Sequence, residues 1–133
     1  MSEQMVQRGL DKLSQMRGPA AAGAIKAVID DGGFGSDFGA LAAEFAFARV
    51  WDQPGLEAKH RSLVTIAVLA TQGRMGELRN HIEVGLNHGL TTVELEAAFM
   101  QIAAYAGLPA GWSALRVAQE LVVARPEPTQ ERE

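Results

Sequence analysis

Two side chains that could transfer protons stand four residues apart in this sequence. A helix through Glu77 and His81 places both on the same face. At about 100° per residue, His88 falls on the same stripe two turns further on. A carboxylate beside an imidazole suits general acid–base chemistry when burial and neighbouring charges tune the two groups. The alternative is an ordinary surface pair that contributes about 0.3 kcal/mol to the helix.

The residues around this stripe predict that it lies at the border between core and solvent. An apolar stripe runs beside it, formed by Leu78, Ile82 and Leu86. The far side carries Arg79, Glu83 and Asn87. A border position would partly desolvate the acid–base pair, as proton transfer requires.

Other side chains could bind a substrate. Arg61 follows Lys59 and His60 at the start of a long apolar segment, and a cationic cluster there could receive a carboxylate. A solvated helix start is the alternative. The aromatic side chains that could line a pocket, or equally belong to the core or an interface, are Trp51, Tyr105 and Trp112.

Metal and thiol chemistry have little support. The chain has no cysteine, which removes disulfides, thiolate ligands and cysteine nucleophiles. It has three histidines and no HExxH motif, and His60 is predicted on a different helix from His81. We therefore expect no metal site.

Length and composition predict one soluble domain. The chain has 133 residues, of which 47% are hydrophobic, and a net charge of -4. This charge gives no reason to expect nucleic acid or an anionic membrane as partner. There is no apolar run of the roughly 18 residues that a membrane span needs, and the N-terminus is polar. We expect a cytoplasmic protein.

The apolar spacing is helical throughout, so the predicted fold class is all-α. We expect an antiparallel bundle of about six to seven helices in a single domain, residues 1–125, followed by a frayed tail, residues 126–133. The predicted helices cover approximately residues 3–16, 19–29, 36–50, 57–72, 77–88, 92–106 and 109–124.

Two local signals mark where helices begin, and a third feature predicts how one helix is buried. Ser36 is a predicted N-cap, and Thr91 with Glu94 forms a predicted capping box. Residues 63–69 are apolar nearly all round, which predicts a helix buried on every side. In so small a protein, other subunits would have to supply part of that cover.

Several segments together resemble the gamma-carboxymuconolactone decarboxylase family, over approximately residues 34–121. In chain order they are Val50-Trp51, PGL at 54–56, RSLVTIA at 61–67, ELRNHI at 77–82, GLT at 89–91 and YAGLPA at 105–110. A related AhpD-like branch carries a CxxCxxxH thiol motif. Here those positions hold Arg74, Glu77 and His81, so thiol–disulfide exchange is excluded at this site.

The resemblance implies an AhpD-like helical subunit in a homo-oligomer, usually a ring-like hexamer. It also implies a lyase of the beta-ketoadipate pathway of aromatic breakdown, which converts 4-carboxymuconolactone to an enol-lactone with loss of carbon dioxide. The leaving carboxylate is conjugated to the lactone carbonyl, so no cofactor is needed as an electron sink. Under this hypothesis His81 donates a proton, Glu77 orients it or tunes its pKa, and Arg61 binds a substrate carboxylate. Arg49 and Arg74 are weaker candidates for that binding role.

Some residues depart from the family pattern. The segment before residue 34 matches poorly, and Phe47-Ala48-Arg49 replaces a more usual Trp-Gly followed by an acidic or polar residue. His88 stands where asparagine is usual, and Trp112 where a smaller residue is expected. These departures favour an alternative: isomerisation, dehydration or lactone opening of another aromatic- or polyketide-derived acid on the same fold. A non-enzymatic helical assembly protein is a further alternative.

Overall fold

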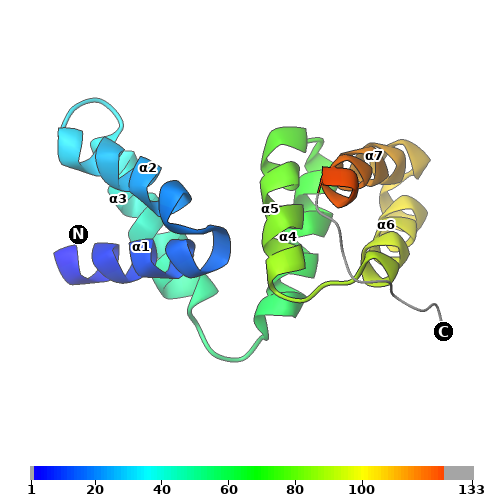
Figure 1. Ribbon diagram of the computed structural model, residues 1–133, viewed down its shortest axis with the longest axis horizontal. Helices are drawn as coiled ribbons and strands as arrows, with labels where there is room; N and C mark the ends of the chain where they lie inside the picture. Colours follow the sequence, from blue (N-terminus) through cyan, green and yellow to red (C-terminus); the bar gives the residue numbers. More distant parts are fainter. Residues whose placement is uncertain (1, 125–133) are drawn as a thin grey trace. The chain divides into compact units, whose positions relative to one another are not determined.

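The computed structural model describes residues 2–124, and this part of the chain contains helices and no strands. The elements are α1 (Glu3–Arg17), α2 (Pro19–Asp31), α3 (Ser36–Leu41), the π-helix η1 (Ala42–Trp51), α4 (Ala58–Gln72), α5 (Met75–Asn87), α6 (Thr92–Ala106) and α7 (Leu108–Ala124) (Figure 1). The predictions of an all-α fold and of its helix number are confirmed.

The chain divides into two compact units, residues 1–57 and 58–133. The division falls in the segment between η1 and α4, which contains Pro54 and Gly55. The single domain over residues 1–125 therefore stays a prediction. The predicted tail, residues 126–133, lies outside the described residues.

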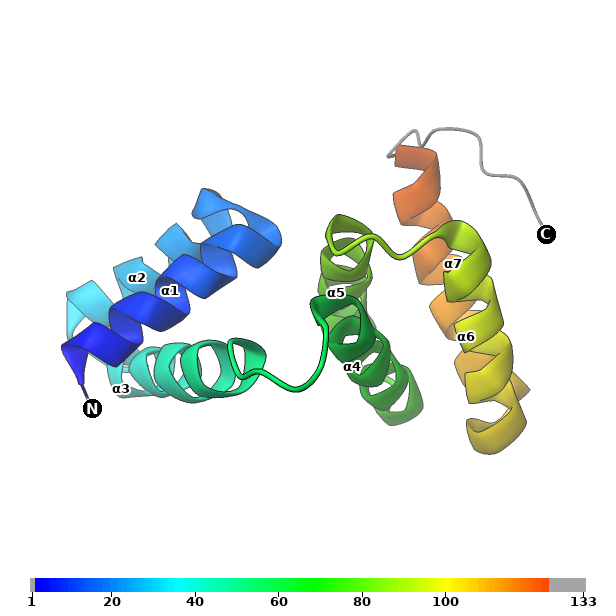
Figure 2. The ribbon, with the colours of Figure 1, turned by 90° about the horizontal axis from the view of Figure 1, so that it is seen from below.

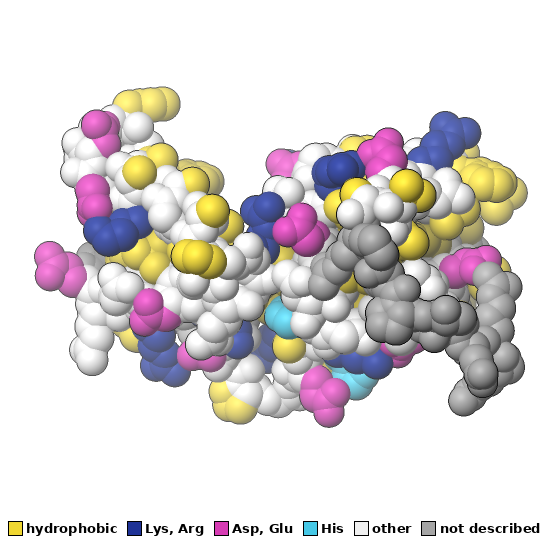
Figure 3. Space-filling view, viewed as in Figure 1, with side chains coloured by type: hydrophobic (Ala, Val, Ile, Leu, Met, Phe, Trp, Pro, Cys, Tyr) yellow, Lys and Arg dark blue, Asp and Glu magenta, His cyan; other side chains and the backbone are white. Residues whose placement is uncertain are grey.

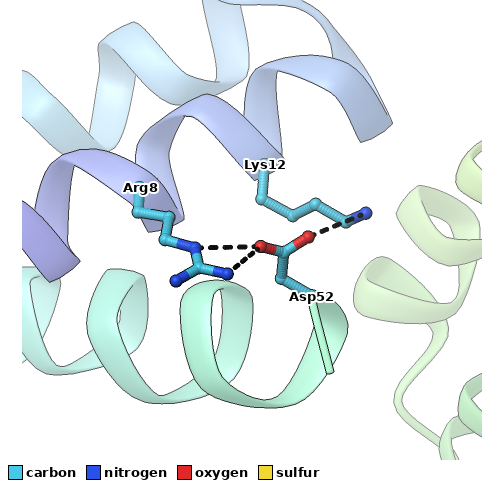
Figure 4. A network of polar contacts seen from close by, with 3 residues as sticks. All are labelled: Arg8, Lys12 and Asp52. Carbon is cyan, nitrogen blue, oxygen red and sulfur yellow. Dashed lines mark hydrogen bonds and ion pairs between the residues drawn. The ribbon is translucent and has the colours of Figure 1, made fainter. Parts of the chain in front are cut away.

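In the first unit, α1 packs against η1 and α2 (Figure 2). Gly9 makes the contact with η1 possible, because a Cβ there would lie 1.8 Å from the carbonyl oxygen of Ala43. At the end of η1, Asp52 accepts a hydrogen bond from Arg8 Nε at 3.0 Å and forms an ion pair with Lys12 at 3.7 Å (Figure 4). These bonds attach the end of η1 to α1.

The predicted helix over residues 36–50 is present, but its second part is a π-helix. Residues five apart approach each other there, and Glu44 forms an ion pair with Arg49 at 3.4 Å. The prediction of Ser36 as N-cap is wrong. Gly35 holds the cap position with φ 98°, a left-handed conformation that favours glycine, and Ser36 is the first helical residue.

In the second unit, α4 to α7 enclose a continuous core. Its buried members are Ile66, Ala70, Leu78, Ile82, Leu86, Leu90, Leu95, Phe99, Ile102, Ala114 and Ala118. The predicted capping box is confirmed: Glu94 N–H donates to Thr91 Oγ1 and Thr91 N–H to Glu94 Oε1, both at 3.0 Å. It fixes where α6 begins.

Within one chain, helix α4 is covered on part of its surface. Ser62, Ile66 and Ala70 are buried, but Val64 and Val68 are 56% and 48% exposed. Burial of the remaining surface by other subunits stays a prediction. None of the described helices is long and apolar enough to cross a membrane.

Candidate functional site

Helix α5 carries the predicted acid–base pair at its beginning. Leu78 and Ile82 are fully buried and anchor the helix in the core. The Glu77 side chain is 58% exposed, and His81 is half-buried with its Nδ1 atom buried. His81 therefore lies at the border between core and solvent, as predicted from the spacing, whereas Glu77 lies mostly in solvent.

Glu77 lies in the first turn of α5, where the helix dipole favours a negative charge. Its carboxylate forms a loose ion pair with Arg74, the residue at the N-cap position, at 3.9 Å. The structure thus places one predicted cation beside the predicted carboxylate. Both side chains are mostly exposed, so this pair contributes little to stability.

His88, at the other end of the stripe, bonds to helix α4. Its Nδ1 lies 2.9 Å from the Oγ of Ser62, a side chain that is fully buried. Ser62 was not predicted from the sequence as a site residue. The available signal was a serine inside an otherwise apolar segment, where a buried hydroxyl needs a partner.

Arg61 precedes Ser62 on α4 and is half-buried. Its carbonyl oxygen accepts a hydrogen bond from Thr65 Oγ1 at 2.9 Å. In the predicted cationic cluster, Lys59 is paired with Glu94 at 2.8 Å and His60 is exposed. The Lys59 hydrogen bond, helped by the backbone N–H of Thr91, lowers the pKa of the Glu94 carboxyl. Lys59 therefore pairs with the start of α6. Arg61 stays the predicted partner of a substrate carboxylate.

The aromatic candidates lie on different surfaces. Tyr105, which is 88% exposed, lines a hollow of about 510 Å³ between α4 and α6. Trp112 lines a hollow of about 200 Å³ between α6 and α7. Arg49 and Trp51 belong to η1 in the first unit. Because they line separate hollows, Tyr105 and Trp112 do not share one pocket.

Figure 3 shows charged side chains of both signs on the face that it draws. In the described part of the chain, no three histidine, aspartate or glutamate side chains gather closely enough to hold a metal ion. Glu77, His81 and His88 carry groups that can transfer protons or form hydrogen bonds, and arginine side chains can bind carboxylates.

Comparison with known proteins gives one family and several relatives. The model of the carboxymuconolactone decarboxylase family matches residues 36–120, from α3 into α7. The chain is 38% identical to 4-carboxymuconolactone decarboxylase of Acinetobacter baylyi over 119 residues, which are 90% of this chain and 87% of that protein. It is 35% identical to nitrosuccinic acid decarboxylase of Metarhizium robertsii over 82 residues, which are 62% of this chain and 57% of that protein.

Proposed function

This chain belongs to the carboxymuconolactone decarboxylase family, and from that premise we propose that it is a carboxy-lyase that converts 4-carboxymuconolactone, or a closely related carboxylated lactone, to an enol-lactone. The observation that carries the proposal is the 38% identity to the Acinetobacter baylyi enzyme over 90% of this chain. The matched segment contains Glu77, His81 and Arg61, the residues to which the chemistry is assigned.

The reaction suits proton transfer without a cofactor. Loss of carbon dioxide from a carboxylate conjugated to the lactone carbonyl leaves an extended enolate, so the lactone itself accepts the electron pair. The enzyme has to bind a dianion, stabilise the enolate oxygen and protonate a carbon atom. We assign the proton donor to His81, whose half-buried ring lies at the edge of the core. Glu77, one turn before it, tunes the basicity of that ring.

The proposal also assigns substrate binding to cationic side chains of the second unit. Arg61 binds one substrate carboxylate, and Arg74, which pairs loosely with Glu77, is a weaker candidate. His88 is a candidate hydrogen-bond partner for the substrate. The remaining candidates for substrate contact are Arg49, Trp51, Tyr105 and Trp112.

The proposal includes a homo-oligomer, either a trimer or a hexamer, in the cytoplasm. Large apolar side chains remain exposed on a single chain, and the exposed ones on the face of α3 and η1 are Phe38, Leu41 and Phe45. Contiguous apolar surface of this kind marks a protein interface. A second copy of the chain is the partner we propose.

An assay of carbon dioxide release from 4-carboxymuconolactone tests the function. We expect turnover by the wild type and a loss of about 10²- to 10⁴-fold in kcat for His81→Ala, the usual contribution of a general acid. His60→Ala is the matched control, because His60 is an exposed histidine on α4 without an assigned role. Full activity of His81→Ala would remove His81 from the mechanism.

A second candidate is decarboxylation of a different acid. The Metarhizium robertsii relative is named for nitrosuccinic acid, and this chain departs from the family pattern at Arg49, His88 and Trp112. Both named relatives are decarboxylases, which favours this candidate over isomerisation, dehydration or lactone opening. If folded wild-type protein releases carbon dioxide from nitrosuccinate and not from the lactone, the second candidate replaces the first.

A further inference from the structure

Ser62 is a buried polar side chain that the proposed mechanism does not use. Within residues 2–124, Ser62 and Glu44 are the polar or charged side chains that are buried. Ser62 is fully buried, and its hydroxyl bonds to His88 Nδ1 at 2.9 Å. No other hydrogen bond of this hydroxyl is found in the described residues.

The burial of Ser62 decides which way this hydrogen bond runs. A buried O–H group needs an acceptor, and the imidazole nitrogen is the acceptor within reach. The hydroxyl therefore donates to Nδ1. A neutral ring that accepts at Nδ1 carries its proton on Nε2. The opposite arrangement, with Nδ1–H donating to Ser62, would leave the serine O–H buried without an acceptor.

The packing of α5 on α4 holds the two side chains together. Gly85 faces α4, where a Cβ would lie 3.5 Å from Ser62 Cβ and 2.7 Å from Leu90 Cδ1. The missing side chain lets α5 approach Ser62 closely. His88 is also fixed by its backbone, since its N–H donates to the carbonyl oxygen of Val84 at 2.9 Å. The imidazole is thus held at its backbone and at Nδ1.

We infer that Ser62 is a positioning residue for the proposed reaction, because its hydroxyl holds the His88 ring neutral with the proton on Nε2. This inference rests on the proposed function. His81 and His88 are seven residues apart, about 10 Å along the helix axis, so Ser62 acts on a ring distinct from the proposed proton donor.

The tautomer of His88 can be measured without activity. We expect ¹⁵N-histidine NMR spectra of the wild type at a pH where the ring is neutral to place the His88 proton on Nε2. The signal is assigned by its absence from His88→Ala. In Ser62→Ala, a fraction of Nδ1–H tautomer is expected to appear. A wild-type ring with its proton on Nδ1 would overturn the inference.

Kinetics test the role of the pair in the reaction. Ser62→Ala is expected to lower kcat/KM about 10-fold, the effect of losing one hydrogen bond, and to have no further effect in a His88→Ala background. Thr65→Val is the matched control, because it removes a hydroxyl from the same helix that bonds only to the Arg61 carbonyl. Equal kcat/KM values for Ser62→Ala and Thr65→Val would overturn the positioning role. If the wild type does not decarboxylate the lactone, the proposed function fails, while the NMR result still decides the state of His88.

Discussion

We propose that Glu77 acts on His81 through its charge. It lies one turn before the histidine, in the first turn of α5, and its side chain is mostly exposed. Glu77→Gln preserves the shape and removes the charge, so we expect kcat to fall about 10-fold, which is less than the loss of the general acid itself. The measurement is kcat for lactone decarboxylation.

Glu83→Gln provides the control for this charge effect. Glu83 lies on the same helix, away from the Glu77–His81 stripe, and has no assigned role. Its kcat should equal that of the wild type. If both substitutions lower kcat equally, the effect comes from the overall charge of α5 and Glu77 has no particular role.

Arg61 should act on substrate binding. A charge-assisted hydrogen bond to a carboxylate contributes about 1.5–3 kcal/mol, so we expect Arg61→Ala to raise KM by about 10- to 100-fold with a smaller change in kcat. Arg116→Ala, on α7, removes an exposed arginine without an assigned role. Steady-state kinetics on both variants give the comparison, and an unchanged KM in Arg61→Ala would assign the substrate carboxylate to another cation.

At this scale, the sequence predicted the acid–base stripe and missed the contact between helices. Periodicity alone placed His81 at the edge of the core, because the buried Leu78 and Ile82 fix how α5 is turned. The bond from Ser62 to His88 joins residues 26 apart in the chain. It depends on how closely two helices approach, which helical spacing within one segment does not contain.

Gly9 decides whether α1 can lie against η1. A Cβ at Gly9 would lie 1.8 Å from the Ala43 carbonyl oxygen, and this oxygen belongs to helical backbone that cannot rotate away. Gly9→Ala therefore forces the helices apart, and we expect it to destabilise folding by about 3 kcal/mol or more. Chemical denaturation gives the free energy of unfolding.

Gly23 in α2 is the control for the helix propensity of alanine. A Cβ at Gly23 would meet no atom within 4 Å. Gly23→Ala should therefore stabilise the protein by about 0.5–1 kcal/mol. If both alanine variants gain stability, α1 and η1 do not pack as closely as the structure shows.

The stability that the capping box gives to the start of α6 should depend on pH, because the box includes the Glu94 carboxylate. The folded pKa of Glu94 is lowered, mainly by the Lys59 hydrogen bond, so its contribution is present above the ordinary value of 4.5 and is lost as pH falls through the lower folded pKa. Glutamine can still complete a capping box. We expect Glu94→Gln to lose about 0.2–1 kcal/mol at pH 7, and the difference from wild type to shrink below pH 4.5.

Thermal unfolding of wild type and Glu94→Gln between pH 7 and pH 3 gives the measurement. Lys59→Met, which removes the cation and keeps much of the apolar stem, should reproduce the loss at pH 7. A difference between wild type and Glu94→Gln that stays constant down to pH 3 would contradict the lowered pKa.

Helix boundaries were largely predictable, because caps and glycine stops are local signals. Thr91 with Glu94 gave the start of α6, and Gly107 its end. The change from α-helix to π-helix after Leu41 was not predictable, since the same apolar residues suit either helix. The predicted N-cap, Ser36, is one residue too late, because Gly35 in a left-handed conformation already holds the cap position.

At the scale of the whole molecule, the family match and the division into units do not coincide. The match covers residues 36–120, whereas the first unit ends at residue 57. Residues from α3 and η1 therefore belong to the family pattern although they pack with α1 and α2. The helices before residue 36 lie outside the family model, but the 119-residue match to the Acinetobacter baylyi enzyme extends into them.

The apolar face of α3 and η1 gives the last prediction. Phe38, Leu41 and Phe45 are 76%, 51% and 58% exposed. The spacing of three residues places Phe38 and Leu41 together on α3, and Phe45 follows in the first turn of η1. Such a patch is unfavourable in water, and the proposed homo-oligomer would bury it. Phe45→Glu places a charge in the patch, so we expect the oligomer to dissociate toward the 14.2 kDa subunit in sedimentation measurements.

Phe45→Leu is the matched control, because it keeps an apolar side chain at the same position and should leave the assembly intact. The exposed side chain of Phe45 contributes little to the fold of one chain. If Phe45 lies in an interface, the new charge should therefore weaken association and leave the fold of the subunit unchanged. Helical circular dichroism of Phe45→Glu should therefore match the wild type. A wild type that sediments as a single subunit would contradict the homo-oligomer. An oligomer that survives Phe45→Glu would place its interface on another surface, such as the exposed valines of α4.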